Sequence, residues 1–145
     1  MPIEGMVDAL SRARRWLRPD GCLIDLRPAT ELVARVSVGT AAAGWTDTGT
    51  LDVEATRRTR YAAADGAVAT ALDRRWFALQ SERTFDFSRY ADSPDELRDY
   101  IAAKWRETRM GPQTHARAVE SFRAQAGMKV RLTERLVIRQ LTAAR

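Results

Sequence analysis

The chain has 145 residues, of which 45% are hydrophobic and 30% are charged. This length and composition are typical of one soluble globular domain with a single core, which we expect to cover residues 1–145. No apolar run approaches the roughly 20 residues that a helix needs to cross a bilayer, so no membrane partner is expected. The N-terminal segment carries acids and arginines where a signal peptide is apolar, and the sequence therefore predicts a cytoplasmic protein.

The basic excess gives a formal net charge of +5, which can indicate a nucleic-acid partner. Only Lys104 and Lys129 are lysines, and the other basic residues are arginines scattered among acids and alanines. That mixture is typical of the codon usage of a GC-rich genome, so we do not expect nucleic-acid binding. Cys22 and His115 are the only cysteine and histidine. They exclude an internal disulfide and a zinc site built on the usual ligands, and no metal site is predicted.

The first third of the chain predicts a helix followed by strands. Apolar residues recur at helical spacing over residues 3–18, and Pro-Asp-Gly at 19–21 supplies a turn. Residues 22–26 form a short, mostly apolar run, which is typical of a strand buried on both faces of a parallel sheet. Residues 32–39 alternate as a strand, and the small, turn-rich stretch 41–50 is expected to pair back on it as a hairpin.

The middle of the chain predicts helices around one strand. Residues 51–79 have the periodicity of one long helix, or of two with a break at Asp65-Gly66, because glycine costs about 1 kcal/mol relative to alanine in a helix. Residues 82–90 alternate as a strand. Ser93, Pro94 and Glu96 fit the N-cap, N1 and N3 positions of a further helix, which is expected to run to about Thr108.

The end of the chain predicts one more helix and a long strand. Gly111-Pro112 opens the helix, and Gly127 sits where a glycine commonly follows a helix end. Residues 128–141 are predicted to form the strand. Four apolar residues are expected to lie together on one of its two faces: Val130, Leu132, Leu136 and Ile138. The whole pattern predicts an α/β (α+β) fold with a mixed sheet packed by helices.

The segment ALSRARRWLRPDGCLIDLRP, residues 9–28, resembles part of the class I S-adenosylmethionine-dependent methyltransferases. In that family a helix ends in an "LRPGG" turn and enters the fifth strand of the sheet. Met1-Pro2 look like the tail of an "HHxP" element that often lies just upstream. Beyond residue 28 the resemblance is one of topology: a strand, a capped helix, another helix and a long terminal strand are similar to the family's last elements.

The resemblance implies a truncated Rossmann-like half-domain. In the family, a Gly-rich loop and an acidic residue that bind the cofactor lie before the matching segment, and the run Gly39 to Gly44 does not have their spacing. We therefore expect no cofactor-binding residues in this chain, with S-adenosylmethionine bound only if the missing half is supplied. A half sheet leaves an open edge and an uncovered face, and these predict a homodimer.

An acidic residue, a basic residue and a tyrosine are candidates for chemistry. Asp25 and Arg27 fall at the carboxyl end of the predicted parallel strand, where open α/β sheets place ligands. Asp25 is a candidate base and Arg27 a candidate clamp for a carboxylate or phosphate, with a structural salt bridge between them as the alternative. Tyr61 is a candidate phenolic acid, with half-buried packing as the alternative.

Three further residues are candidates for substrate binding. Trp45 and Asp47 lie in the glycine-flanked stretch, where a tryptophan can wall a small-molecule pocket; the alternative is an aromatic residue that covers the edge of the core. Arg58, with Arg57 and Arg60, is a candidate anion-binding group, although such a charge run on a helix is commonly a solvated face.

Three functions are compatible with these patterns. The first is a methyltransferase-like half-domain that contributes the substrate side and does not transfer methyl groups alone. The second is a cofactor-independent enzyme of the cyclase or isomerase type in secondary metabolism, with a small-molecule pocket between the hairpin and the long helix. The third is a non-catalytic dimerisation or binding module.

Overall fold

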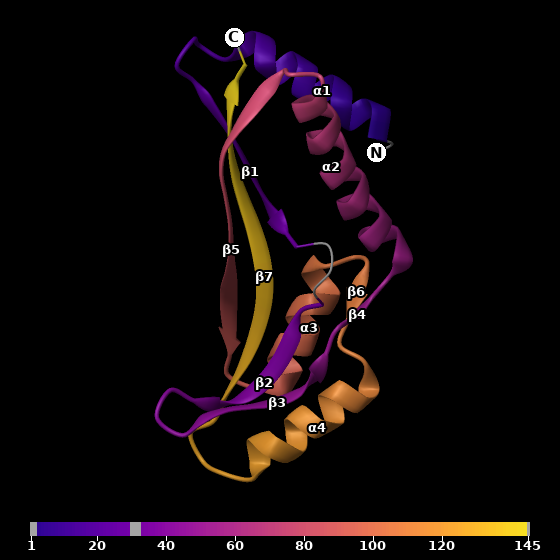
Figure 1. Ribbon diagram of the computed structural model, residues 1–145. Helices are drawn as coiled ribbons and strands as arrows, with labels where there is room; N and C mark the ends of the chain where they lie inside the picture. Colours follow the sequence, from indigo (N-terminus) through magenta and orange to yellow (C-terminus); the bar gives the residue numbers. More distant parts are fainter. Residues whose placement is uncertain (1–2, 30–32, 145) are drawn as a thin grey trace. The chain divides into compact units, whose positions relative to one another are not determined.

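The computed structural model describes residues 3–29 and 33–144 (Figure 1). The proposed likeness of Met1-Pro2 to a family motif therefore lies outside the described residues. The chain divides into two compact units, each made from separate stretches. Unit 1 comprises Met1–Thr30, Thr56–Phe85 and Leu136–Arg145, and unit 2 comprises Glu31–Ala55 and Asp86–Arg135. Both contain helices packed on a sheet, which confirms the predicted α/β class at this level.

Unit 1 is a sheet covered by two helices. Its elements are α1 (Ile3–Trp16), β1 (Cys22–Pro28), α2 (Ala55–Asp73) and parts of the long strands β5 (Phe77–Ala91) and β7 (Lys129–Ala143). The strand β7 pairs with both β1 and β5. The core contains Val68, Ala71, Phe77 and Leu141, with Leu10, Leu17, Leu23, Leu72 and Trp76 packed against it.

The strand β1 corrects the prediction of a parallel strand buried on both faces. It runs antiparallel to β7, from Cys22 opposite Thr142 to Pro28 opposite Leu136. Its burial alternates: Leu23 packs against the core of unit 1, whereas Ile24 is 51% and Leu26 is 54% exposed. The sequence of residues 22–26 is typical of a strand buried on both faces because it carries a leucine on each face, which hides the period of two.

The helix α2 is unbroken through Gly66 and ends at Asp73. A Cβ atom at Gly66 would lie 3.0 Å from Cδ1 of Ile3, so the missing side chain makes room for α1 rather than for a kink. Residues 77–79, which the sequence placed in this helix, begin β5 instead. That part of the prediction is wrong because Phe77 is buried in the sheet, where its packing outweighs the helical spacing.

The variant Gly66→Ala is expected to stabilise the protein by up to about 1 kcal/mol, because alanine has the higher helix propensity. Among the described residues, the atom near the new methyl group is the tip of Ile3, a flexible side chain at the start of α1 that is 39% exposed. Urea unfolding followed by circular dichroism measures the change. Ala62→Gly, at an exposed position of the same helix, should lose a similar amount, and a loss in Gly66→Ala would show that Ile3 cannot move aside.

Unit 2 is built on a hairpin, and α4 packs against both of its strands. Its elements are β2 (Arg35–Thr40), β3 (Gly44–Thr50), β4 (Asp52–Val53), α3 (Pro94–Lys104), β6 (Thr108–Arg109) and α4 (Pro112–Arg123), with the remainder of β5 and β7. The strand β2 pairs antiparallel with β3 and with β7, and β4 pairs antiparallel with β6. Its core includes Val36, Val38, Leu97, Ile101, Val130 and Leu132. The predicted hairpin is confirmed.

The helix α3 begins as predicted and ends earlier. Ser93 Oγ accepts a hydrogen bond from the backbone N–H of Glu96 at 3.1 Å, and the carboxylate of Glu96 accepts one from the N–H of Asp92 at 2.7 Å. The last helical residue is Lys104, not Thr108. Thr108 instead pairs with Val53 in the short β4–β6 sheet, a partner that is distant in sequence and left no local signal.

The long strand β7 does not present one apolar face along its length. In unit 2, Val130 and Leu132 are buried, as predicted. In unit 1 the buried residues are Val137 and Leu141, so burial changes from even to odd positions. The prediction of a single face through Leu136 and Ile138 is wrong because each unit covers its own part of the strand.

Candidate functional site

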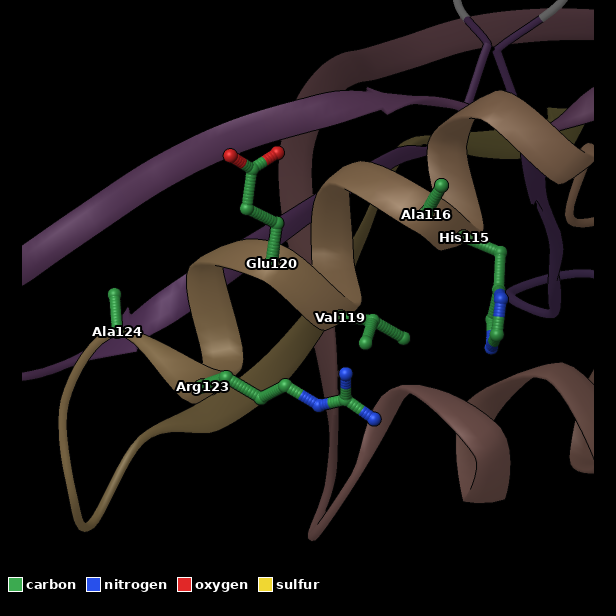
Figure 2. Close-up of a pocket in the computed structure, with 6 residues that line it drawn as sticks. All are labelled: His115, Ala116, Val119, Glu120, Arg123 and Ala124. Carbon is green, nitrogen blue, oxygen red and sulfur yellow. The ribbon is translucent and has the colours of Figure 1, made fainter.

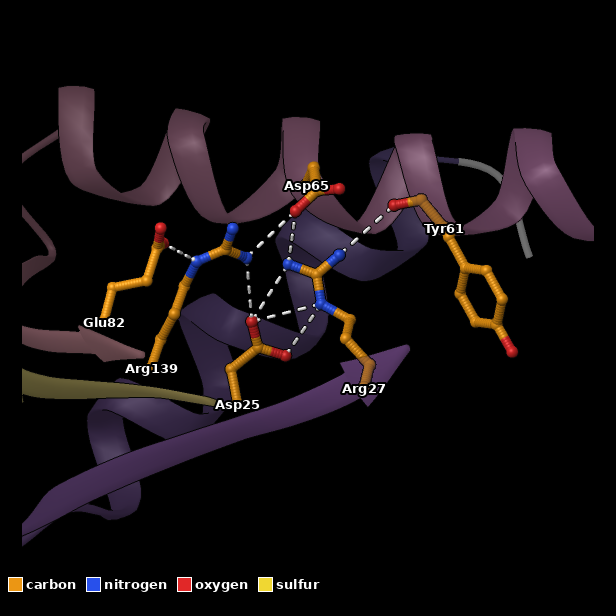
Figure 3. Close-up of polar contacts among 6 residues, drawn as sticks. All are labelled: Asp25, Arg27, Tyr61, Asp65, Glu82 and Arg139. Atoms are coloured by element: carbon orange, nitrogen blue, oxygen red, sulfur yellow. Dashed lines mark hydrogen bonds and ion pairs between the residues drawn. The ribbon is translucent and has the colours of Figure 1, made fainter. Parts of the chain in front are cut away.

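Three of the predicted site residues meet in an ion-pair cluster within unit 1 (Figure 3). Asp25 and Arg27 stand two residues apart on β1, so both point to the side of the sheet that faces α2. Arg139 lies directly opposite Asp25 in the β1–β7 register. Asp65 reaches the same place from α2, and Glu82 from β5.

The contacts in this cluster are short and numerous. The guanidinium of Arg27 donates to Asp25 through Nε, at 3.0 and 3.1 Å, and through Nη2, at 2.9 Å. It also lies 2.8 Å from Oδ1 of Asp65. Arg139 Nη1 donates to Asp25 at 3.2 Å and to Asp65 at 2.9 Å, and its Nε donates to Glu82.

The electrostatics of the cluster hold Arg139 in its charged form. Burial alone would lower the pKa of Arg139, but hydrogen bonds to Glu82 and Asp65 outweigh it and raise the pKa above its usual value. Both oxygens of Asp25 already accept hydrogen bonds from Arg27. This geometry agrees with the structural salt bridge between Asp25 and Arg27 rather than with a free base and an open anion clamp.

Tyr61 takes part in the cluster through its backbone and not through its phenol. Its carbonyl oxygen accepts from Arg27 Nη1 at 3.2 Å, while the ring points away from the carboxylates (Figure 3). The hydroxyl accepts from Arg57 Nε at 3.0 Å. Arg58 is exposed on the same helix, α2.

The other two predicted residues lie in unit 2. The ring of Trp45, on β3, lies against the guanidinium of Arg131, whose central carbon is 4.3 Å from the ring centroid. It also contacts Tyr90, with ring centroids 5.6 Å apart. Asp47 Oδ1 accepts from the N–H of Gly49 at 2.8 Å, and Oδ2 lies 3.9 Å from Arg35. The carboxylate of Asp47 therefore binds a backbone group of its own strand, β3.

Arg131 belongs to this group although no prediction from the sequence included it. Its Nε is buried and has no hydrogen-bond partner among the described residues, and its Nη2 lies 3.5 Å from Ser37 Oγ. A usable signal was present, because Arg131, Arg135 and Arg139 recur every four residues in the final strand. Side chains at that spacing point to the same face of a strand.

A hollow of about 590 Å³ lies along α4 in unit 2 (Figure 2). The helix α4 and the residue that follows it supply the lining: His115, Ala116, Val119, Glu120, Arg123 and Ala124. His115 Nε2 lies 2.9 Å from the carboxylate of Asp95. Glu120 points to the other side of the helix from Arg123 (Figure 2). The hollow includes none of the predicted site residues.

Within residues 3–29 and 33–144 there is no group of three or more acidic, histidine or cysteine side chains arranged to hold a metal ion. In the same part of the chain, no helix is both long and apolar enough to cross a membrane. Comparisons with protein-family models, curated proteins and solved structures found no match.

Proposed function

We propose that this chain acts as the C-terminal half of a class I methyltransferase-like fold of Rossmann type. In this role it supplies the substrate side, and methyl transfer from S-adenosylmethionine requires a cofactor-binding half joined to it. The observation that carries the proposal is the edge of the sheet in unit 1, since within the described residues β1 pairs only with β7. One side of β1 is therefore available for another strand.

The local structure around β1 supports this assignment. The helix α1 leads into a tight turn, in which the N–H of Gly21 donates to the carbonyl of Arg18 at 2.8 Å, and the chain then enters β1. This is the helix, turn and strand order of the methyltransferase segment that residues 9–28 resemble. Because the carboxylate of Asp25 is occupied by arginines, a cofactor-independent enzyme that uses Asp25 as its base is less favoured.

The uncovered face of the same sheet supports a protein partner. Ile24 and Leu26 lie exposed on one face of β1. Glu82 and Asp86, at even positions of β5, contact arginines at odd positions of β7. Phe85 is at an odd position of β5, so its side chain, which is 41% exposed, points to the opposite face. Leu26 and Ile138 lie on that face. We propose that in the isolated chain this edge and face are covered by a second copy, which gives a homodimer.

Calorimetry with S-adenosylmethionine tests the first part of the proposal. The isolated chain is expected to show no binding at micromolar ligand concentration, because the residues that would hold the cofactor belong to the other half. Binding with a micromolar Kd would contradict this division of roles.

Light scattering tests the homodimer. The chain is expected to have the mass of a dimer, and the double variant Ile24→Lys/Leu26→Lys is expected to be a folded monomer, since buried charges at the contact are costly. The control Ala69→Lys, at an exposed position of α2, should remain a dimer. A wild-type monomer, or a dimer that tolerates both lysines, would rule out this interface.

A further inference from the structure

The sheet of unit 2 has a second face, opposite its core, that carries a separate group of side chains. Val36 and Val38 of β2 point into the core, so Ser37 and Gly39 point to the other face. Residues directly opposite each other in a sheet share a face. Trp45 is opposite Gly39, and Arg131 is opposite Ser37, so these residues stand together on the face away from the core.

The ring of Trp45 contacts both the guanidinium of Arg131 and the ring of Tyr90. Tyr90 belongs to β5 and Trp45 to β3, with β7 and β2 between them. Three strand spacings amount to roughly 14 Å, yet the two ring centroids are only 5.6 Å apart. The rings therefore lean toward each other across the sheet, on a face where Gly39, directly opposite Trp45, has no side chain.

Arg131 differs from the cations around it in forming no direct ion pair with a carboxylate among the described residues, although its charge contributes to the low pKa of Asp86. Lys129 lies 2.5 Å from Asp92, and Arg135 donates two hydrogen bonds to Asp86. The hydrogen bond from Arg135 keeps the pKa of Asp86 below its usual value. Arg131 has the face of Trp45 and one long contact to Ser37.

This pairing leaves the guanidinium of Arg131 incompletely satisfied. A guanidinium carries five N–H donors, and the Nε of Arg131 is buried without an acceptor. The aromatic face attracts the positive charge, but it does not replace the planar pair of oxygens that a guanidinium binds best. Tyr90, whose ring contacts Trp45, is 59% exposed and offers an aromatic surface to a ligand.

We propose that this face binds a small aromatic oxyanion, that is, a carboxylate or phosphate attached to a planar ring. Arg131 holds the oxyanion, Ser37 adds a hydroxyl donor, and the ring of the ligand stacks on Tyr90. The proposal concerns unit 2 alone and holds whether or not unit 1 serves methyl transfer.

Titration of the wild-type chain with phenyl phosphate, benzoate and inorganic phosphate tests the ligand class. We expect saturable binding of phenyl phosphate, of benzoate, or of both, seen as a shift of the Arg131 side-chain Nε–H resonance and a change in tryptophan fluorescence. The preferred probe decides between a phosphate and a carboxylate. Inorganic phosphate should bind at least about tenfold more weakly, because it lacks the stacking contribution. No saturable shift with any probe would overturn the proposal, and equal binding of inorganic phosphate would overturn the aromatic part.

Matched variants test whether Arg131 is the residue that binds the oxyanion. Arg131→Gln should weaken binding of the preferred aromatic probe by about tenfold or more, because a charge-assisted pair is lost. Arg35→Gln makes the same charge change on the same face and should bind as wild type. Tyr90→Leu should weaken the aromatic probe and leave inorganic phosphate unchanged. Should Arg131→Gln not fold, Arg131→Lys keeps the charge without the planar fork, and undiminished binding by either folded variant would overturn the assignment.

Discussion

Asp25→Asn is expected to lower the free energy of unfolding by about 2–4 kcal/mol, because removal of one charge from a largely buried ion-pair cluster leaves its partners uncompensated. The side chain of Asp25 is 18% exposed, and those of Arg27 and Arg139 are 10% and 16% exposed. An asparagine has one acceptor oxygen where the carboxylate has two, so the contacts of both arginines are weakened. Urea unfolding monitored by far-UV circular dichroism measures the loss.

The matched control for this change is Asp99→Asn. Asp99 pairs with its neighbour Arg98 at 3.0 Å, but its side chain is 70% exposed, so water screens the pair. We expect a loss of at most about 0.5 kcal/mol there. A double-mutant cycle between Asp25→Asn and Arg139→Gln should give a coupling of about 1 kcal/mol or more. Equal losses in Asp25→Asn and Asp99→Asn would mean that the cluster contributes no more than a surface pair.

Gly39→Ala is expected to destabilise the protein by about 3 kcal/mol or more, because the added methyl group meets backbone atoms that cannot rotate away. A Cβ at Gly39 would lie 2.0 Å from the carbonyl oxygen of Gly44 and 2.9 Å from the Cα of Trp45. The hairpin must open to admit it, which also moves Trp45 away from Arg131. Thermal unfolding measures the stability, and tryptophan fluorescence reports the displaced ring.

Gly127→Ala serves as the control, because it measures the cost of placing an alanine at a positive φ without a steric clash. Gly127 has a φ of 77°, a conformation that costs an alanine about 1–2 kcal/mol, but a Cβ there would meet no atom of residues 3–29 and 33–144 within 4 Å beyond its own chain neighbours. Its loss should therefore be the smaller of the two. If Gly39→Ala were as stable as wild type, with its fluorescence unchanged, the close approach of β2 and β3 at this glycine would be disproved.

Several elements were predictable because their causes lie within a few residues of one another. The spacing of apolar residues indicated α1, and Ser93, Pro94 and Glu96 together marked the start of α3. The turn-rich stretch after β2 indicated the hairpin. Capping, turn formation and helical periodicity act over one or two turns of chain, so they remain visible without a structure.

The direction of β1 and the existence of β6 were not predictable in this way. An apolar run such as residues 22–26 fits either a parallel or an antiparallel neighbour, and the neighbour proved to be β7, more than a hundred residues away along the chain. The strand β6 has two residues, Thr108 and Arg109, and forms only because β4 is there to pair with it. Such pairings leave no local pattern.

The sequence by itself determined that this chain is an α/β protein, where most of its helices begin, and that Asp25 and Arg27 lie at the carboxyl end of a strand. The tertiary structure alone decided what those side chains meet. In unit 1, Arg139 donates a hydrogen bond to Asp25, and Asp65 forms an ion pair with Arg27. In unit 2, the guanidinium of Arg131 lies against the ring of Trp45 and not against a carboxylate. The physical reason is that a charge is neutralised by whatever lies within a few ångströms in space, and the partners lie far apart along the chain.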